Sequence, residues 1–229
     1  MLNDTRLHGE IEFSLPGFSI VRSDKNTGDS TSGGVAIAIP DSWDVEIVPS
    51  VSVSAIGCES VGVLTTPPRS NPIKLLSIYN HPQNHAPQHI FKEFKNIKFN
   101  DKEVNGFIGG DLNCPHEAFS SRFSNVYGTG LLNLVYNLGL IVLDNDEPTI
   151  YHQGEPNILD LFICEPSSLP IVEECYVGES IGSDHLPLIT HARLSCKGNP
   201  PTHKKKIFFD PAGYLSLIHI SEPTRRTII

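Results

Sequence analysis

The sequence predicts an α/β fold that is rich in strands and built around two packed β-sheets. Short apolar runs, separated by clusters of Gly, Pro, Asn and Ser, dominate its 229 residues, whereas two segments have helical spacing. Consecutive strands with few helices between them are typical of sheets that pack face to face. With 39% hydrophobic and 19% charged residues, the chain has the composition of a globular protein with a substantial core.

The expected strands follow one another along most of the chain. Residues 35–39 form an uninterrupted apolar run, which predicts a strand buried on both faces. In the next run, Val45 and Ile47 alternate with polar neighbours, which predicts a strand with one buried face. The full set of expected strands comprises residues 18–22, 34–39, 43–48, 60–64, 73–79, 104–108, 140–143, 158–164, 171–177 and 186–191.

Two helices are expected between these strands. Pro87 is suited to a first helical turn, and the apolar residues that follow it form one stripe: Ile90, Phe91, Phe94 and Ile97. Thr129 is the expected N-cap of the second helix, and Gly139 is expected to end it. The apolar stripe of the second helix consists of Leu131, Leu132, Val135 and Leu138.

The composition changes near residue 195, where the packed domain is expected to end. Residues 1–194 form the predicted domain, and residues 195–212 form a polar, proline-containing and basic linker. Residues 216–225, SLIHISEPTR, are similar to the translation of a sequencing-library adaptor. We therefore expect the natural reading frame to be cut near Gly213, and residues 213–229 to be a non-native tail.

Charge and cysteine content exclude several classes of protein. Seventeen basic and 26 acidic residues give a net charge of −9, so no bulk positive field draws the chain to nucleic acid or to an anionic membrane. No apolar run approaches the roughly 20 residues that span a bilayer, and the first ten residues lack the apolar core of a secretory signal. Five widely spaced cysteines without a CxxC pair argue against a disulfide framework or a structural zinc site, and favour an intracellular protein.

The first candidate for chemistry follows the expected strand at residues 104–108. Gly109 and Gly110 precede Asp111, and Asn113 comes two residues later. Paired glycines let a backbone approach a ligand closely, and Asp111 and Asn113 are expected to share one face. The alternative is an ordinary junction between a strand and a turn, in which Asp and Asn serve as turn formers.

The second candidate is a pairing between Asp160 and His185. Asp160 lies among apolar neighbours in the expected strand at residues 158–164, and a buried carboxylate needs a partner because desolvation of an unpaired charge is costly. His185 stands at the entrance of the next apolar strand but one. Asp160 would then orient the imidazole ring and stabilise its charge. The alternative is a structural ion pair.

Tyr79 and Asp4 are weaker candidates when taken alone. Tyr79 closes the strand at residues 73–79, where its phenol is placed either to bind a phosphate oxygen or to cap the edge of the core. Asp4 is a candidate metal ligand that is otherwise a solvated loop residue.

Taken in order, these residues resemble the motifs of the endonuclease/exonuclease/phosphatase superfamily. Within it, the likeness is to the apurinic-endonuclease-like endonuclease domain of non-LTR (LINE-type) retrotransposons, and it extends over about residues 1–194. The segments that carry it are Leu2-Asn3-Asp4-Thr5-Arg6-Leu7 with Leu15-Pro16-Gly17-Phe18, Gly33-Gly34-Val35-Ala36-Ile37, Ser77-Ile78-Tyr79, Gly109-Gly110-Asp111-Leu112-Asn113, Pro148-Thr149 and Ser183-Asp184-His185-Leu186-Pro187.

The resemblance implies a four-layer α/β/β/α sandwich of two mostly antiparallel sheets, with the site at one end of both. It also implies phosphodiester hydrolysis with a divalent cation, Mg²⁺ or Mn²⁺. By position, Asp4 matches a metal-binding acidic residue, and Asp184 matches a further metal-site or water-orienting carboxylate. Mg²⁺ prefers carboxylate oxygen and retains several waters, so few protein ligands suffice.

The same resemblance implies roles for the remaining site residues. His185 with Asp160 matches the dyad that contacts the scissile phosphate, either as a general base or as an electrostatic stabiliser. Asp111 matches the residue that handles the proton of the water or of the leaving group. Asn113 and Tyr79 match residues that position the phosphate.

The chain departs from the family in several places, among them Asn157, where the family more often has serine. The family's first strand, which bears a metal-site asparagine, is missing, so we expect an N-terminally truncated frame. Asp4 stands where the family usually has glutamate, one methylene longer. After Tyr79 the usual phosphate-site asparagine is shifted, and either Asn80 or Gln83 takes its place.

The function that follows is an endonuclease module that nicks DNA so that a retrotransposon's reverse transcriptase can prime on the new end. The natural protein is then expected to continue into a reverse transcriptase domain and to act in the nucleus, with DNA as its partner and no membrane association. One alternative is a phosphatase or phosphodiesterase of the same superfamily that acts on a small substrate. Another is an inactive, decayed fragment.

Overall fold

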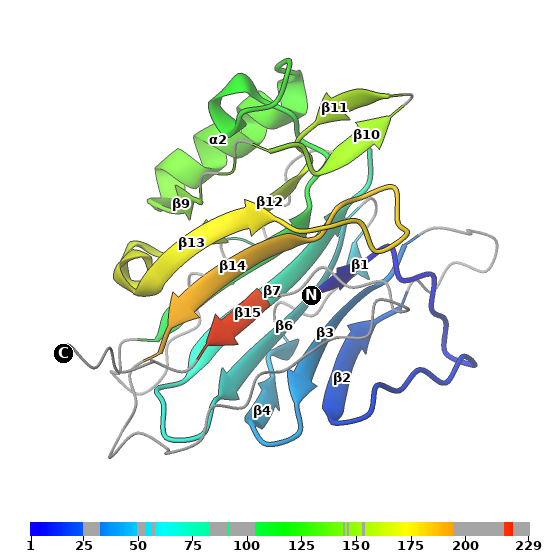
Figure 1. Cartoon of the computed structure of the whole chain (residues 1–229), viewed down its shortest axis with the longest axis vertical. Coiled ribbons are helices and arrows are strands. Elements are labelled where there is room, and N and C mark those ends of the chain that lie inside the picture. The colour runs from blue at the N-terminus through cyan, green and yellow to red at the C-terminus, as the bar shows by residue number, and fades with distance from the viewer. Residues whose placement is uncertain are drawn as a thin grey trace.

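Two layers of β-sheet face each other, and a helix covers the outer face of the larger layer (Figure 1). The computed structural model describes residues 1–24, 33–49, 54–55, 58–82, 91, 104–143, 145, 147–152, 154–194 and 218–221. This arrangement confirms the expected α/β sandwich. It also confirms that most strand pairs are antiparallel, because among the described strands two pairs, β7 with β8 and β14 with β15, are parallel.

The larger layer is a seven-stranded sheet with the order β4-β6-β7-β8-β12-β9, in which β5 also pairs with β6. Its strands are β4 (Asp44–Ile47), β5 (Ser54–Ala55), β6 (Cys58–Thr66), β7 (Ile73–Asn80), β8 (Asn105–Asp111), β9 (Ile141–Val142) and β12 (Asp160–Cys164). The central strands are buried along nearly their whole length. This matches the near-continuous apolar runs of their sequences.

The second layer consists of two three-stranded sheets. One has the order β1-β3-β2 and is built from β1 (Leu2–Asn3), β2 (Phe18–Ser23) and β3 (Val35–Pro40). The other has the order β13-β14-β15 and is built from β13 (Val172–Val177), β14 (Leu188–Arg193) and β15 (Ile218–Ser221). The described part of the stretch expected to be a non-native tail thus forms a strand beside β14. A hairpin of β10 (Ile150–His152) and β11 (Glu155–Asn157) stands apart from both layers.

Two hydrophobic cores lie on the two faces of the large sheet. The core between the sheets includes Ile37 from β3, Val61 from β6, Phe107 from β8 and Leu188 from β14. The other core lies under helix α2 (Val126–Leu138), which buries Leu131, Leu134 and Val135 against the large sheet. Both cores hold the strands of this sheet rigidly, so side chains at the strand ends have well-defined positions.

Helix α2 begins earlier than its apolar stripe predicts. Asn125 is the N-cap, and its side chain accepts a hydrogen bond from the backbone amide of Gly128, so the expectation that Thr129 caps the helix is wrong. Thr129 lies in the first turn, where its hydroxyl donates to the carbonyl of Asn125. The helix ends at Gly139 as expected, in the left-handed conformation that glycine adopts easily. The first expected helix lies outside the described residues apart from Phe91.

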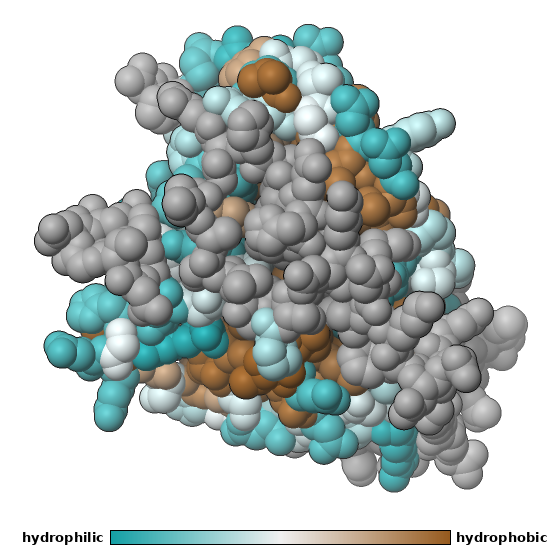
Figure 2. Space-filling model, turned by 180° about the vertical axis from the view of Figure 1, so that it is seen from behind, coloured by the Kyte–Doolittle hydropathy of each residue, from teal (hydrophilic) through white to brown (hydrophobic). Residues whose placement is uncertain are grey.

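Strand β4 does not bury the face that its alternation predicts. Val45 is 36% exposed and Ile47 is 52% exposed, and among the described strands β4 pairs only with β6, at the edge of the sheet. The surface also exposes Val126 and Tyr136 of α2, and the reverse face shows apolar areas among hydrophilic ones (Figure 2). No helix in the described part of the chain is long and apolar enough to cross a membrane.

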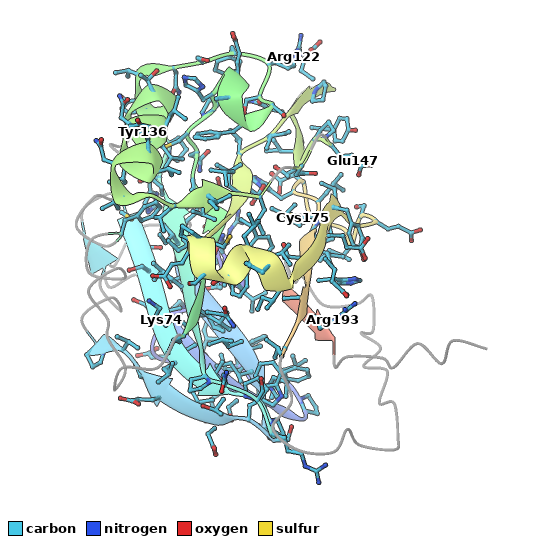
Figure 3. The ribbon with its side chains drawn as sticks, turned by 90° about the vertical axis from the view of Figure 1, so that its left-hand side faces the viewer. Lys74, Arg122, Tyr136, Glu147, Cys175 and Arg193 are labelled. Atoms are coloured by element: carbon cyan, nitrogen blue, oxygen red, sulfur yellow. The ribbon has the colours of Figure 1, made fainter. Side chains whose placement is uncertain are left out.

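The two ends of the large sheet differ in chemistry. At the start of β7, Lys74 forms a buried ion pair with Glu165, with 3.0 Å between Nζ and Oε1. Arg122, which pairs with Glu155 of the hairpin, lies toward the other end of the molecule from Lys74 (Figure 3). The end of the sheet away from Lys74 is where β7 and β8 finish and where the expected site residues are placed.

Candidate active site

A row of four polar residues crosses the large sheet at this end. The strand registers pair Glu59 of β6 with Tyr79 of β7, Tyr79 with Asp111 of β8, and Asp111 with Asp160 of β12. Directly opposed residues on neighbouring strands point to the same face of a sheet. Tyr79 belongs to the core between the sheets, so the row closes the end of that core.

Asp160 and His185 form a direct pair. Asp160 Oδ2 lies 2.7 Å from His185 Nδ1, the distance of a strong, charge-assisted hydrogen bond. Asp160 is 7% exposed, whereas the side chain of His185 is 26% exposed. The pair therefore joins a buried carboxylate to an imidazole ring that reaches solvent, as expected from the sequence.

The charge of His185 follows from this pairing. Burial lowers the pKa of His185, but the hydrogen bond and the charge of Asp160, with smaller effects of Asp111 and Asp184, raise it overall to about 9. The ring is therefore an imidazolium at neutral pH. A protonated ring cannot act as a general base, so the geometry favours electrostatic stabilisation of a negatively charged group.

Asn113 is bound to Asp111 by two hydrogen bonds. Its backbone amide donates to Asp111 Oδ1 at 3.1 Å, and its side-chain amide donates to Oδ2 at 2.9 Å. The side-chain amide also donates to the carbonyl of Asn80. Asn113 adopts a φ of 48°, a conformation that asparagine tolerates better than most residues. This turn brings Asn113 back to Asp111, so the two side chains lie together.

Asp111 is a carboxyl group that holds its proton unusually strongly. Burial raises its pKa well above the usual range, and the charge of Asp160 raises it further, although His185 and Asn113 partly offset both effects. Tyr79 is 7% exposed, and burial together with the charges of Asp4, Asp111 and Glu59 raises the pKa of its phenol. Both groups are thus proton donors in a site surrounded by negative charge.

Asp4 lies near this row but has other partners. Its carboxylate accepts hydrogen bonds from the backbone amide of Gly33 and from Arg6, whose Nη2 is 3.2 Å from Oδ2. Asp184 is exposed, and Ser183 Oγ is 3.3 Å from its Oδ1. Within the described ranges, no three His, Cys, Asp or Glu side chains are grouped so that they hold a metal ion together.

The donor chemistry of the site nevertheless fits a hard divalent cation. Mg²⁺ binds through one or two carboxylates and otherwise keeps water and phosphate oxygens. Asp4 and Glu59 both place negative charge near the phenol of Tyr79, and a cation would offset this charge.

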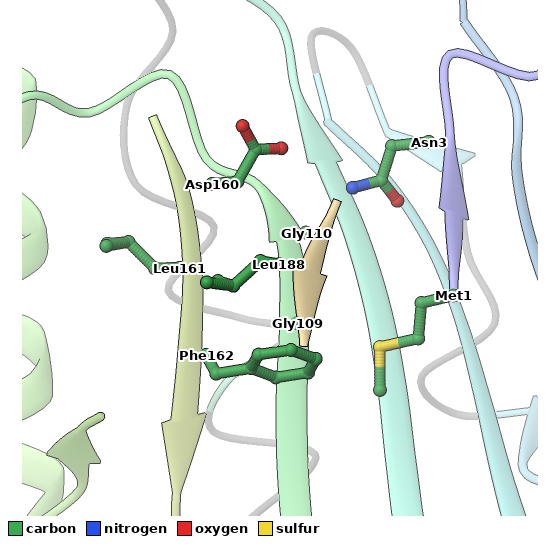
Figure 4. Close-up of a pocket in the computed structure, with 8 residues that line it drawn as sticks. All are labelled: Met1, Asn3, Gly109, Gly110, Asp160, Leu161, Phe162 and Leu188. Atoms are coloured by element: carbon green, nitrogen blue, oxygen red, sulfur yellow. The ribbon is translucent and has the colours of Figure 1, made fainter. Parts of the chain in front are cut away.

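Gly109 and Gly110 are both required by close packing. A Cβ atom at Gly110 would collide with the carbonyl of Ile78, and one at Gly109 would collide with the ring of Phe162. Both glycines line a small pocket with Asp160 and Asn3, whose polar ends face each other above Gly110 (Figure 4). Asn3 is held there by Ser77, whose hydroxyl donates to Asn3 Oδ1.

Two residues position the site in ways that sequence reasoning did not assign. Thr149 is fully buried, and its hydroxyl oxygen accepts hydrogen bonds from the backbone amides of Leu159 and Asp160. Its carbonyl accepts from the amide of Leu186, next to His185. Thr149 therefore fixes the start of β12 and the segment that carries the imidazole.

Asn80 is the second such residue. It is fully buried, and its side-chain amide donates to the carbonyl of Leu112 at 2.9 Å. This position makes Asn80 a support for the turn of Asp111 and Asn113. Gln83, the other expected replacement, lies outside the described residues.

Comparison with known proteins places these observations in a family. No curated protein matches the sequence significantly. Among solved structures, the chain is similar to the endonuclease domain of TRAS1, a telomere-specific non-LTR retrotransposon, with 25% identity and a TM-score of 0.61 over 75% of this chain and 76% of that one.

Two further structures share the fold. An AP endonuclease, LMAP, from Leishmania major has 13% identity and a TM-score of 0.60, over 76% of this chain and 70% of that one. An AP endonuclease from Archaeoglobus fulgidus has 15% identity and a TM-score of 0.56, over 81% of this chain and 85% of that one. A family model described as endonuclease-reverse transcriptase matches residues 73–189, just over half of the 229 residues. That segment contains Tyr79, Asp111, Asn113, Asp160 and His185, and the chain therefore belongs to the endonuclease-reverse transcriptase family.

Proposed function

We propose that the chain is a metal-dependent endonuclease that nicks DNA, and that the nick primes a retrotransposon's reverse transcriptase. The observation that carries this proposal is the 2.7 Å contact between Asp160 and His185, placed beside Asp111 and Asn113. A protonated imidazole next to a proton-holding carboxyl group suits the hydrolysis of a phosphodiester, in which negative charge builds up on phosphorus-bound oxygens. The family of the chain and its likeness to the TRAS1 domain support DNA as the substrate.

Each residue has a role in this reaction. The imidazolium of His185 binds the scissile phosphate and stabilises its developing charge, while Asp160 holds the ring in place. Asp111 gives its proton to the oxygen of the leaving strand as the bond from phosphorus to that oxygen breaks, and it regains a proton from the attacking water. Asn113 holds the carboxyl group of Asp111 in position. The phenol of Tyr79 stays protonated and donates a hydrogen bond to a phosphate oxygen.

Asp4 and Asp184 are the proposed ligands of Mg²⁺. When bound, the cation supplies positive charge that neutralises the phosphate and favours attack by water. Asp4 already has Arg6 and the amide of Gly33 as partners, so binding of the cation at Asp4 competes with the ion pair to Arg6. The proposed partners of the natural protein are DNA and a reverse transcriptase domain, and its proposed location is the nucleus.

A plasmid-nicking assay tests the function. We expect the chain to convert supercoiled plasmid to the open circular form in Mg²⁺ or Mn²⁺, and EDTA to abolish this conversion. His185→Ala should reduce nicking by about 10²–10⁴-fold, because it removes the charge at the phosphate.

His191→Ala is the matched control. His191 Nδ1 lies 2.6 Å from Glu174 Oε1, so it is also paired with a carboxylate, but the pair joins β13 and β14 away from the row. Equal background nicking by the wild type, His185→Ala and His191→Ala would indicate an inactive fragment. Hydrolysis of a small phosphate ester, without nicking of DNA, would instead indicate a phosphatase of the same superfamily.

A further inference from the structure

A second pair of carboxylate and imidazole lies at the same end of the sheet as Asp160 and His185. Glu59 is 2% exposed, and its Oε1 lies 3.6 Å from His81 Nε2. Its other oxygen, Oε2, accepts a hydrogen bond from the backbone amide of Gly34. A buried carboxylate requires such partners, so Glu59 orients the ring of His81 just beyond the end of β7.

The ring of His81 is held beside the row and reaches the surface. Its centroid is 4.7 Å from that of Tyr79, in an edge-on arrangement with an interplanar angle of 63°. The side chain of His81 is 20% exposed. Among the described residues, Nδ1 of His81 has no hydrogen-bond partner, so one ring nitrogen faces Glu59 and the other is open to a ligand.

The acidity of the site determines what ligand suits this position. Asp4 and Glu59 place negative charge near Tyr79, and a phosphodiester strand that crosses the row needs basic groups to offset their repulsion. His185 provides one such group on the β12 side. On the β6 and β7 side, Arg6, whose side chain is 69% exposed, carries a positive charge, and His81 adds an imidazole that binds a phosphate through a ring N–H.

The spacing of the two pairs matches a single nucleic-acid strand. Glu59 and Asp160 are separated by three strand spacings across β6, β7, β8 and β12. At about 4.8 Å for each spacing, this amounts to roughly 14 Å. One strand of a duplex advances by about 3.4 Å along the helix axis for each nucleotide, and its phosphates lie farther apart than this, so roughly 14 Å spans at most a few nucleotides.

We propose that His81 binds a second phosphate of the DNA strand, a few nucleotides from the bond that is cut. Glu59 acts as the positioning residue for this ring, as Asp160 does for His185. The inference rests on the proposed function, because it assigns a phosphate contact to the same substrate. It predicts that His81 contributes to the binding of DNA more than to the rate of the chemical step.

Binding of a short duplex in EDTA tests the inference without any cleavage. A neutral methylphosphonate replaces one phosphate at a time, and each duplex is titrated against the wild type, His81→Ala and His191→Ala. With the unmodified duplex, His81→Ala should weaken binding by about tenfold, the effect expected when one charge-assisted hydrogen bond is lost. His191→Ala, which removes the imidazole that pairs with Glu174 away from the row, should bind the duplex with an affinity within about twofold of that of the wild type.

The position-specific result separates a phosphate contact from a structural role. At one flanking position, the methylphosphonate should weaken binding by the wild type as much as the His81→Ala substitution weakens binding of the unmodified duplex. The same methylphosphonate should not weaken binding by His81→Ala any further. His81→Gln, which retains a side-chain N–H donor for Glu59, is compared by thermal unfolding and by the same titration. We expect His81→Gln to unfold at the temperature of the wild type, but to bind that phosphate as weakly as His81→Ala does.

The outcomes are distinct from those of the nicking assay. If the wild type binds the duplex and shows the position-specific loss but does not nick plasmid in Mg²⁺, the inference stands and the proposed function fails. The inference would be overturned if every methylphosphonate weakened binding by His81→Ala as much as it weakened binding by the wild type. It would also be overturned if His81→Ala bound the unmodified duplex as tightly as the wild type does. In steady-state nicking kinetics with Mg²⁺, we expect His81→Ala to have a higher KM than the wild type and a kcat within about twofold of the wild-type value.

Discussion

Asp160 lies directly opposite Asp111 across the antiparallel pair of β12 and β8, so two buried carboxyl groups face the same side of the sheet. Like charges in this position repel each other. The imidazolium of His185, 2.7 Å from Asp160, is the counterion that makes the arrangement tolerable. The stability of the fold therefore depends on the protonation of this end of the sheet.

The first prediction is that the free energy of unfolding falls as the pH rises from about 6.5 to 9. The pKa of His185 is raised from 6.5 to about 9 in the folded chain, so its contribution is complete below pH 6.5 and is lost as the pH passes through 9. The raised pKa of Asp111 acts in the same direction, because it too disfavours deprotonation of the folded chain. We expect a loss of about 2–3 kcal/mol, measured by urea unfolding at a series of pH values.

Asp160→Asn provides the control for this pH dependence. Without the carboxylate, His185 loses the partner that raises its pKa, and Asp111 loses the charge that repels it. The decline in stability between pH 6.5 and 9 should therefore shrink by at least half in the variant. An unchanged slope would show that other groups carry the pH dependence.

The second prediction concerns Asp111→Asn. Burial and the charge of Asp160 oppose ionisation of Asp111. The free energy of unfolding of Asp111→Asn, relative to that of the wild type, should therefore be about 1 kcal/mol more favourable at pH 9 than at pH 6. The same change removes the proposed proton donor and should reduce nicking by about 10²-fold or more. Chemical unfolding at both pH values and the plasmid assay measure the two effects. Loss of stability at pH 9 would contradict the assigned protonation of Asp111.

The pairing of Asp160 with His185 could be predicted because Asp160 stands among apolar residues, where a carboxylate needs a partner, and His185 lies at the entrance of another apolar strand. The motif of Asp111 and Asn113 was recognisable because it follows an apolar strand. Glu59 gave no comparable signal, because a single acid at the start of an apolar strand is common. Its importance comes from the register with Tyr79, which depends on the packing of β6 against β7 rather than on local sequence.

The departures from expectation also have physical causes. Val45 and Ile47 alternate like residues of a half-buried strand, but local alternation does not reveal that β4 is at the edge of the sheet. Thr129 and Asn125 are both good N-cap residues, and the choice between them depends on the preceding loop. Paired glycines let a backbone approach a ligand, but the local sequence does not reveal that Gly110 is also required by the carbonyl of Ile78 on the neighbouring strand.

The third prediction is that Thr149→Val destabilises the fold and lowers activity together. Valine matches the shape of threonine but leaves the buried amides of Leu159 and Asp160 without their shared acceptor. We expect a loss of about 1–3 kcal/mol in the free energy of unfolding, and a fall in nicking because Asp160 shifts relative to His185. Thermal unfolding and the plasmid assay give the two readouts.

Thr190→Val is the matched control for this substitution. Thr190 is 1% exposed, and its hydroxyl donates to Cys175 Sγ at 3.3 Å on β14, away from the row. Because sulfur is a weak acceptor, the loss of this bond should cost less than about 1 kcal/mol and leave nicking intact. Equal loss of activity in both variants would mean that Thr149 acts through general stability alone.

The last prediction separates the two uses of glycine in this chain. Gly110 has a φ of +151°, and an added Cβ would collide with the carbonyl of Ile78 and crowd Asn3. Gly110→Ala should therefore strain the pairing of β7 with β8 and destabilise the fold by about 2–4 kcal/mol. Gly130→Ala is the contrast, because a Cβ at this helical position meets nothing within 4 Å. It should stabilise the chain by about 0.5–1 kcal/mol, since alanine favours the helix. Urea unfolding measures both changes. If both substitutions changed the free energy of unfolding in the same direction, the close approach of Gly110 to β7 would not explain why glycine is required there.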